Sequence, residues 1–264
     1  MNRWTPSPRT LVGMVHLDAL PGTPRSCRSV ADIADRAARE TKILVDEGFD
    51  AIMVENMHDL PYLRRTVGPE IVAAMAMAVG AVVDVAGDRP VGVQVLAGAN
   101  REAISIAHAT GARFIRAEGF AYAAVADEGL LDEADAGPLL RHRRNIGAED
   151  VAIWADVRKK HSAHAITGDL GLADLVSGHE FMGADAVIIT GSHTGQAVSV
   201  HDLAAARRAG SLPVAVGSGA TPESLPELLE QAGAVIVGSA LKIDGRWSND
   251  IDPARARAFV TAKG

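Results

Sequence analysis

The segment Gly48-Phe49-Asp50-Ala51-Ile52-Met53-Val54-Glu55-Asn56 contains the pattern on which the fold prediction rests. Its glycine can take the left-handed backbone conformation that ends a helix and turns the chain. A short apolar run follows, and two polar residues stand directly after that run. This order of helix end, buried strand and polar strand end is the unit of an alternating α/β fold.

The same unit recurs along the chain. Glycine followed by a small or acidic residue also precedes later apolar runs, as in Gly111-Ala112-Arg113 and Gly183-Ala184-Asp185. Helical spacing of apolar residues predicts helices between the runs, at Val30–Val45, Pro69–Val85, Arg101–Ala109, Leu170–Met182 and Leu225–Gln231. The expected strands are Leu11–His16, Ala51–Glu55, Val91–Leu96, Phe114–Glu118, Val151–Asp156, Ala186–Thr190, Val214–Gly217 and Val235–Gly238.

Eight such units in about 250 residues favour a (β/α)8 TIM barrel over an open sheet. The strand runs are apolar nearly throughout, which is typical of parallel strands covered on both faces. We therefore expect an irregular N-terminal arm at residues 1–10 and a single barrel domain at residues 11–264.

Composition limits the partners of this barrel. The 264 residues include 26 Lys plus Arg and 33 Asp plus Glu, a formal charge of −7. That sign argues against a protein that coats nucleic acid or a membrane surface. The single cysteine, Cys27, cannot close an internal disulfide, and the N-terminus lacks the apolar core of a signal peptide, so we expect a cytoplasmic protein. The longest apolar run, Ile71 to Val83, is shorter than a membrane span and predicts a buried helix.

Polar residues at the carboxyl ends of the strands are the first candidates for function, because barrel active sites are built there. Such a residue can also cap a helix or close a hydrogen bond across the barrel mouth, so each has a structural alternative. The candidates are His16, Glu55, Asn56, Gln94, Arg116, Glu118, Asp156 and Thr190.

The last two units contain the sharpest local signal. Glycine-serine loops follow the seventh and eighth runs, where barrels often bind phosphate through backbone N–H groups and helix N-termini. Thr221 before Pro222 predicts a helix N-cap and first helical residue. The alternative is that the glycines only make tight turns. The expected phosphate-binding residues are Gly217, Ser218, Gly219, Gly238 and Ser239.

A cationic run, Arg158-Lys159-Lys160-His161, follows the fifth strand. In an acidic chain, this concentration at the expected active-site end favours interaction with an anion over a solvated surface. A lysine there could neutralise a substrate anion, act as an acid or base, or form a Schiff base, and the three alternatives stay open. The connection at 119–135 is the longest, and loops of that length tend to be functional or mobile.

A divalent metal is a further alternative. Four of the strand-end and loop residues could converge as nitrogen and carboxylate ligands for zinc or manganese, namely His16, Glu55, Asp156 and His161. The sequence has no short metal-ligand motif, P-loop, nucleophile elbow or dinucleotide fingerprint, so no cofactor is assigned.

Taken in order, six segments resemble the BtpA/SgcQ family, which is named for a protein implicated in photosystem I biogenesis. The resemblance runs from about Leu11 to Phe259 and implies a TIM-type barrel of the ribulose-phosphate-binding kind, but no reaction. No segment is a pigment-binding or membrane-insertion feature, so the photosystem role is not transferred. The segments are Gly13–Leu17 with Leu20–Pro24, Asp50–Asn56, Ala155–Ser162, Thr190–Gly195, Val216–Gly219 and Val237–Lys242.

The spacing of Asp156 and Lys159 argues against one type of decarboxylation. The Asp156-x-x-Lys159 spacing differs from the Asp-x-Lys-x-x-Asp array of orotidine-phosphate decarboxylase barrels, which disfavours that type of decarboxylation.

The leading hypothesis is an enzyme that acts on a small phosphorylated metabolite, a sugar phosphate or phosphoribosyl compound, as an isomerase, lyase or glycosidic-bond hydrolase. Its catalytic candidates are Glu55 and Asp156 as acid and base, with His16, Lys159 and His161. Its substrate-binding candidates are Asn56, Gln94, Arg116, Lys160 and Thr190. The alternative is a non-catalytic assembly or regulatory factor that senses a phosphorylated ligand. On general grounds we expect a homo-oligomer.

Overall fold

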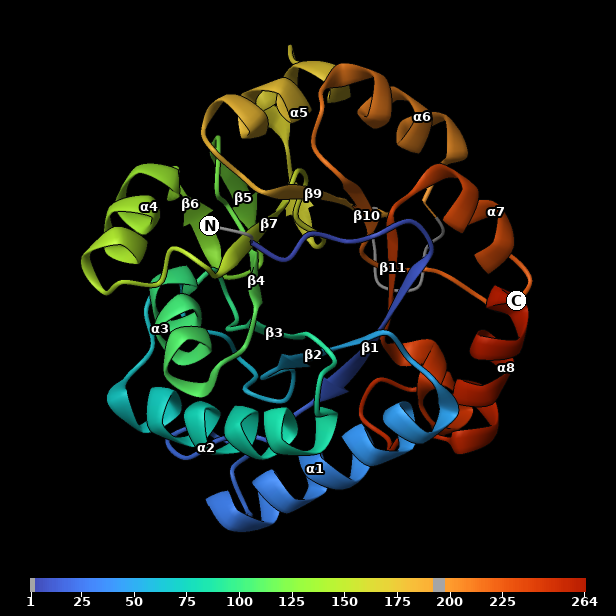
Figure 1. Cartoon of the computed structure of the whole chain (residues 1–264). Helices are drawn as coiled ribbons and strands as arrows, with labels where there is room; N and C mark the ends of the chain where they lie inside the picture. The colour runs from blue at the N-terminus through green and yellow to red at the C-terminus, as the bar shows by residue number, and fades with distance from the viewer. Residues whose placement is uncertain (1–2, 192–197) are drawn as a thin grey trace.

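A computed structural model describes residues 3–191 and 198–264 of the chain. Eight parallel strands close into a barrel in the order β1-β11-β10-β9-β7-β4-β3-β2 (Figure 1). The predicted TIM barrel is therefore confirmed, and each predicted strand is present within a few residues of its expected ends. The strands are β1 (Thr10–His16), β2 (Ala51–Glu55), β3 (Val91–Gln94), β4 (Phe114–Ala117), β7 (Ala152–Asp156), β9 (Ala186–Ile189), β10 (Val214–Val216) and β11 (Ala234–Val237).

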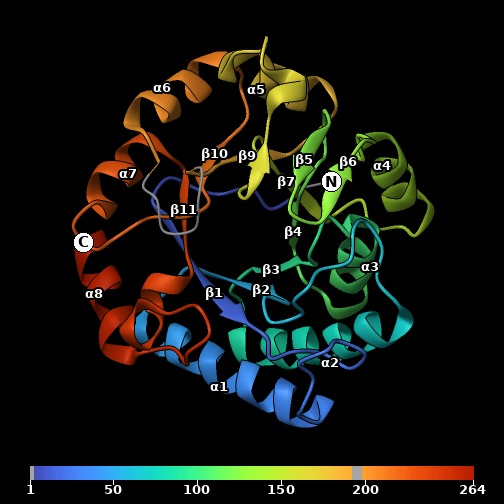
Figure 2. The same cartoon turned by 180° about the vertical axis from the view of Figure 1, so that it is seen from behind.

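Helices form the outer ring, as both views of the ribbon show (Figures 1 and 2). Glycine in the left-handed conformation ends two of them as predicted, at Gly48 (φ 101°) and Gly111 (φ 81°). The helices are α1 (Val30–Glu47), α2 (Pro69–Ala86), α3 (Asn100–Thr110), α4 (Ala136–Asn145), α5 (Leu172–Phe181), α6 (Val200–Ala209), α7 (Leu225–Gln231) and α8 (Pro253–Lys263).

Helix α2 is long and apolar enough to cross a membrane by length and composition alone. In the barrel it packs between α1 and α3, and its Ile71, Met75 and Val79 are buried. The core helix of a barrel has the same apolar composition, because one face packs on the strands.

The core has two layers, separated by the barrel wall. Alternate strand residues point inward, such as Val12 and Met14, while Leu11 and Val15 face the helices. Aromatic rings fill part of the interior: Phe114 and Trp154 stack with ring centroids 4.3 Å apart. Trp4 of the N-terminal arm stacks on Trp154 at 5.2 Å. The arm therefore contributes a packed side chain to the barrel interior.

The long connection after β4 contains a hairpin of β5 (Ala124–Ala126) and β6 (Gly129–Leu131). β5 also pairs with β8 (Ser162–Ala163), which belongs to the connection after β7. A three-stranded antiparallel sheet thus joins the two loops that follow neighbouring barrel strands.

Helix α7 spans the predicted range Leu225–Gln231, with Ser224 as N-cap and Pro226 in its first turn. Residues 222–224 form a turn before it. Thr221 makes hydrogen bonds typical of the predicted N-cap across this turn: its Oγ1 accepts the Ser224 N–H at 3.3 Å, and its own N–H donates to Ser224 Oγ at 3.0 Å. The carbonyl oxygen of Thr221 accepts the Leu225 N–H at 2.9 Å.

Two glycines provide a test of the interior packing. A Cβ at Gly92 would lie 2.3 Å from Phe114 Cζ, whereas a Cβ at Gly80 in α2 would meet no atom within 4 Å. We expect Gly92→Ala to destabilise the fold by about 1–3 kcal/mol through overpacking. Gly80→Ala is the matched control and should stabilise it by up to about 1 kcal/mol through helix propensity. Urea unfolding followed by circular dichroism measures both, and equal effects would contradict the packing of Phe114 against Gly92.

Candidate active site

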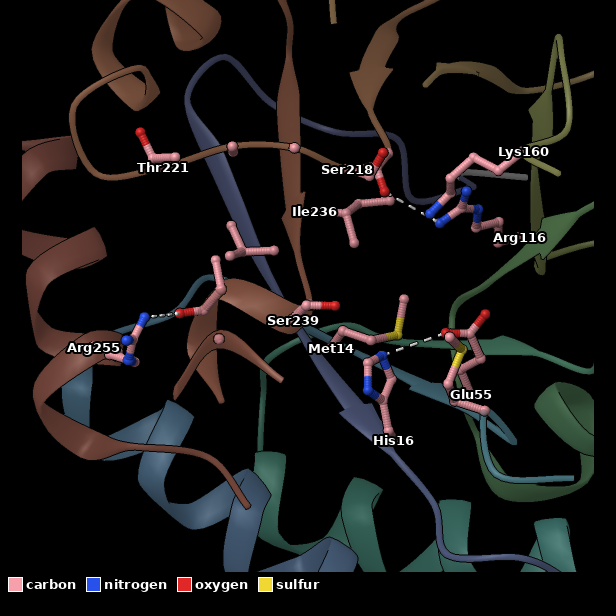
Figure 3. Close-up of a pocket in the computed structure, with 18 residues that line it drawn as sticks. Met14, His16, Glu55, Arg116, Lys160, Ser218, Thr221, Ile236, Ser239 and Arg255 are labelled. Atoms are coloured by element: carbon pink, nitrogen blue, oxygen red, sulfur yellow. Dashed lines mark hydrogen bonds and ion pairs between the residues drawn. The ribbon is translucent and has the colours of Figure 1, made fainter. Parts of the chain in front are cut away.

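A cavity of about 300 Å³ lies at the carboxyl ends of β1, β2, β4, β10 and β11 (Figure 3). Both glycine-serine loops line it, at 217–221 and 238–240. The structure therefore brings together strand ends and loops that are far apart in sequence. The predicted site residues that line this cavity are His16, Glu55, Arg116, Lys160, Gly217, Ser218, Gly219, Gly238 and Ser239.

The first loop has features that only glycine permits. A Cβ at Gly217 would lie 2.4 Å from Thr190 Cγ2, and Gly219 has a φ of +79°. Between them, Ser218 Oγ is buried without a hydrogen-bond partner in the described part of the chain. A buried hydroxyl without a partner is costly, so this atom indicates a place for a polar ligand.

Backbone N–H groups add to this polar surface. The short 3-10 helix η2 (Ser239–Leu241) starts at the second loop, and the first N–H groups of a helix lack internal acceptors. Within 3–191 and 198–264, no acceptor receives the N–H groups of Gly219, Ala220, Ser239 or Ala240. The two loops thus present several free donors at one cavity, which is the arrangement that binds a phosphate group.

His16 and Glu55 form a buried pair at the ends of β1 and β2, strands that place these two residues opposite each other in register. His16 Nε2 lies 3.5 Å from Glu55 Oε2. His16 Nδ1 lies 3.0 Å from the carbonyl oxygen of Trp247. A carbonyl only accepts, so Nδ1 carries the hydrogen and Nε2 of the neutral ring has a lone pair facing Glu55.

The environment of this pair disfavours charge on both groups. Burial lowers the pKa of His16 to about 3, and the positive charge of Lys242 acts in the same direction. Burial also raises the pKa of Glu55, although Arg116 and Lys160 oppose this. The pair is therefore suited to hold one proton between Glu55 and His16 Nε2, as general acid–base groups do.

Asp156 is predicted to act as an acid or base in the site, but its carboxylate binds Arg116 instead. Arg116 Nε donates to Asp156 Oδ2 at 2.8 Å and Arg116 Nη2 donates to Oδ1 at 2.9 Å, so both carboxylate oxygens are engaged. Asp156 does not line the cavity described above, whereas Arg116 reaches it. Burial opposes the charge of Arg116, but Asp156 together with Glu55 and Glu118 outweighs this and raises the pKa of Arg116. Asp156 thus holds Arg116 in place.

Lys159 likewise has protein partners. Its Nζ lies 2.5 Å from Glu128 Oε1 and 3.9 Å from Glu118 Oε1. Glu128 comes from the β5–β6 hairpin, so this ion pair attaches the three-stranded sheet to the barrel mouth. Burial opposes the charge of Lys159, but Glu118 and Glu128 outweigh this and raise its pKa. Lys159 does not line the cavity between the two glycine-serine loops.

The remaining predicted site residues lie outside this cavity. Asn56 donates to Asp59 at 2.8 Å and accepts from the Leu96 N–H at 2.7 Å, which is a structural role. Gln94 is buried beside Glu55 in register, and its Oε1 has no described partner. Thr190 donates to the carbonyl oxygen of Arg158 at 3.0 Å, and His161 is exposed. The family-like segment Thr190–Gly195 continues into residues 192–195, which lie outside the described residues.

The four residues considered as metal ligands do not converge. Asp156 is occupied by Arg116, and His161 is exposed, which leaves only His16 and Glu55 near each other. Among the described residues there is no group of three or more His, Cys, Asp and Glu side chains that could hold a metal ion.

Sequence patterns missed several cavity residues. Arg255 reaches the cavity from α8 and donates to the carbonyl oxygen of Ala240 at 3.4 Å (Figure 3). Met14 and Met57 also line it. Met14 stands two residues before His16, so strand alternation places it on the same face. No local pattern singles out Arg255, because it arrives from the far end of the chain.

Comparison with known proteins finds relatives over nearly the whole chain. The model of the BtpA family matches residues 7–263. An uncharacterised mitochondrial protein of Caenorhabditis elegans is 43% identical over 96% of this chain and 93% of that protein. The photosystem I biogenesis protein BtpA of a Synechocystis species is 37% identical over 96% of this chain and 87% of that protein.

Solved structures with low sequence identity show the same barrel. Thiamine phosphate pyrophosphorylase from Pyrococcus furiosus superposes with a TM-score of 0.57 at 12% identity, covering 97% of this chain and 96% of that one. 3-Hexulose-6-phosphate synthase superposes with a TM-score of 0.58 at 15% identity, covering 96% of this chain and 99% of that one. These likenesses show the barrel fold, which agrees with the predicted TIM barrel.

The buried carboxyl group of Glu118 provides a pH test. Burial raises its pKa from 4.5 to about 7, although Lys159 opposes this. A pKa that is higher in the folded state gives stability at low pH that is lost as the pH rises through about 7. We therefore expect Glu118→Gln to gain about 1–3 kcal/mol relative to the parent protein between about pH 5 and pH 8.

Urea unfolding at four pH values across that interval measures the difference. The exposed Glu227 supplies the control, because Glu227→Gln should leave the pH dependence unchanged. Parallel curves for the parent protein and Glu118→Gln would show that Glu118 does not carry the effect.

Proposed function

The chain belongs to the BtpA family, and we propose that this member is an enzyme that acts on a small phosphorylated metabolite at the carboxyl end of its barrel. One observation carries the proposal: the two glycine-serine loops, the His16–Glu55 pair, Arg116 and Lys160 line one cavity. A site for an anion and a group suited to proton transfer therefore line the same cavity. Barrels of this fold commonly bind phosphate after the last two strands.

The phosphate group is assigned to the loops at 217–221 and 238–240. Their N–H groups and the Ser218 hydroxyl supply donors, and Arg255 supplies a positive charge at the rim. Two structural neighbours, a thiamine phosphate enzyme and a hexulose phosphate synthase by name, are in keeping with this assignment. A sugar phosphate or phosphoribosyl compound fits both the cavity of about 300 Å³ and the polar lining.

Proton transfer is assigned to Glu55 with His16. The Nδ1–H of His16 is held by the carbonyl oxygen of Trp247, so the Nε2 lone pair faces the Glu55 carboxyl and favours its protonated form. A buried carboxyl with a raised pKa can deliver a proton to a substrate oxygen and take one back. Asp156 keeps Arg116 fixed, so that Arg116 can stabilise negative charge that develops on the substrate. Reactions consistent with this set are isomerisation, lyase chemistry and cleavage of a glycosidic bond.

A non-catalytic assembly or regulatory role is the alternative, and the name of the Synechocystis relative favours it. In that case the cavity would serve only to sense a ligand, and the proton-transfer pair could be replaced without loss of function.

A thermal-shift panel of sugar phosphates, phosphoribosyl compounds and nucleotides tests the phosphate site. A ligand at 100 times its dissociation constant should add about 2.7 kcal/mol of stability. The double variant Ser218→Ala/Ser239→Ala should bind a stabilising ligand roughly tenfold more weakly, because two donors are lost. Ser26→Ala changes an exposed serine and is the control. Equal binding by both variants would place the phosphate elsewhere.

Any ligand that stabilises the protein should then be followed for turnover by NMR. Glu55→Gln keeps the size and polarity of the side chain but cannot exchange a proton, so we expect turnover to fall by about 100-fold or more with binding retained. Glu227→Gln should have no effect. Full activity of Glu55→Gln would remove the proton-transfer role, and a panel without any stabilising compound would favour the non-catalytic alternative.

A further inference from the structure

The sequence contains only five lysines, and four of them have ion-pair partners. Lys42 contacts Asp46 on the surface. Three partly or fully buried lysines lie within 2.5–2.7 Å of carboxylate oxygens, in the pairs Lys159–Glu128, Lys242–Glu40 and Lys263–Asp50. Lys160 differs from the other four, because no carboxylate among the described residues lies within 4.0 Å of its Nζ.

Among the described lysines, Lys160 is also the one that lines the cavity between the two glycine-serine loops. Figure 3 shows its side chain next to Arg116 and Ser218, on the side of the loop at 217–221. His16 and Glu55 line the same cavity from β1 and β2. The Lys160 amine, which has no carboxylate partner, therefore lines the same cavity as the proposed phosphate site and the His16–Glu55 pair.

We propose that Lys160 is the nucleophile of this site and forms an imine with the carbonyl carbon of an aldehyde or ketone phosphate. This inference rests on the proposed function, since the phosphate group would hold the carbonyl carbon beside Lys160. It narrows the substrate class to phosphorylated compounds that have a free carbonyl group or open to one.

The bonds and protons of this step balance. The lone pair of Nζ attacks the carbonyl carbon, the C–N bond forms, and a proton moves from nitrogen to the former carbonyl oxygen to give a carbinolamine. The Glu55–His16 pair gives a proton to that hydroxyl, which leaves as water, and the nitrogen lone pair forms the C=N bond. Hydrolysis reverses these steps, returning the proton to the pair and the amine to Lys160.

The surroundings of Lys160 favour the uncharged amine that this attack requires. Burial lowers the pKa of Lys160, and the nearby charge of Arg116 acts in the same direction. The carboxylates of Glu55, Asp156 and Glu118 act in the opposite direction, but burial and Arg116 outweigh them, so the pKa of Lys160 is lowered. Lys159 is the contrasting neighbour: its two glutamates raise its pKa and keep it protonated.

Reductive trapping tests the inference. The protein is incubated with glyceraldehyde 3-phosphate, dihydroxyacetone phosphate or ribose 5-phosphate in the presence of sodium cyanoborohydride, which converts an imine to a stable secondary amine. Intact mass and peptide mapping then locate the adduct. We expect one adduct, on Lys160, to form about 10-fold faster than any adduct on exposed Lys42, because the buried amine is uncharged more often.

Matched variants and competitors complete the experiment. Lys160→Arg should lose the adduct while retaining the charge, and Lys159→Arg, one residue away, should keep it. Inorganic phosphate should slow the trapping of phosphorylated probes, and non-phosphorylated glyceraldehyde should label Lys160 more slowly than glyceraldehyde 3-phosphate does. Peptide mapping of the parent protein gives the answer even if a variant fails to fold.

Two negative results have different meanings. If phosphorylated compounds stabilise the protein but none of the three probes labels Lys160 preferentially, the imine is wrong and the proposed function stands, with Lys160 acting only as a positive charge. If no phosphorylated compound stabilises the protein or competes with trapping, the proposed function fails, and the imine with a phosphate ester fails with it.

Discussion

Arg116 and Asp156 meet at the mouth of the barrel, where β4 and β7 lie side by side and both side chains are removed from water. An unpaired charge in that position would be severely unfavourable, so the two groups depend on their double hydrogen bond. The same constraint applies around the whole mouth, because the parallel strands deliver polar side chains to a small, poorly hydrated space. Each charge there has to find a partner from the protein or from a ligand.

The polar groups at the mouth fall into two sets. In the first set, Asp156 pairs with Arg116 and Glu128 pairs with Lys159. The second set faces the cavity and has no hydrogen-bond partner among the described residues; it comprises Ser218 Oγ, the loop N–H groups and the Lys160 amine. Buried polar groups without partners are costly unless a ligand binds them, so we propose that a ligand binds to the second set.

The last αβ unit holds the His16–Glu55 pair in position. Lys242 is fully buried after η2, and its Nζ donates to Glu40 of α1 at 2.7 Å. Glu40 also accepts the Ile251 N–H at 3.1 Å, so one carboxylate anchors both ends of the segment at 243–250. That segment carries Trp247, whose carbonyl oxygen sets the tautomer of His16. A contact on the outer helix layer thus controls which nitrogen of a catalytic candidate carries the hydrogen.

The barrel, its strands and the end at which its polar residues gather could all be predicted from the amino-acid sequence. Those features follow from local patterns, namely apolar runs of strand length, glycine at helix ends and polar residues directly after strands. A local pattern can be identified without knowing which distant segments pack against it. The contacts of the polar residues could not be predicted in this way and emerged from the folded chain. Asp156 and Glu55 have equivalent positions in sequence, yet one is held by Arg116 and the other faces the cavity. Lys159 and Lys160 are adjacent, yet Glu128 pairs with the first only. Partners such as these come from distant segments, so no local pattern records them, and it is the pairing that separates a structural charge from an available one.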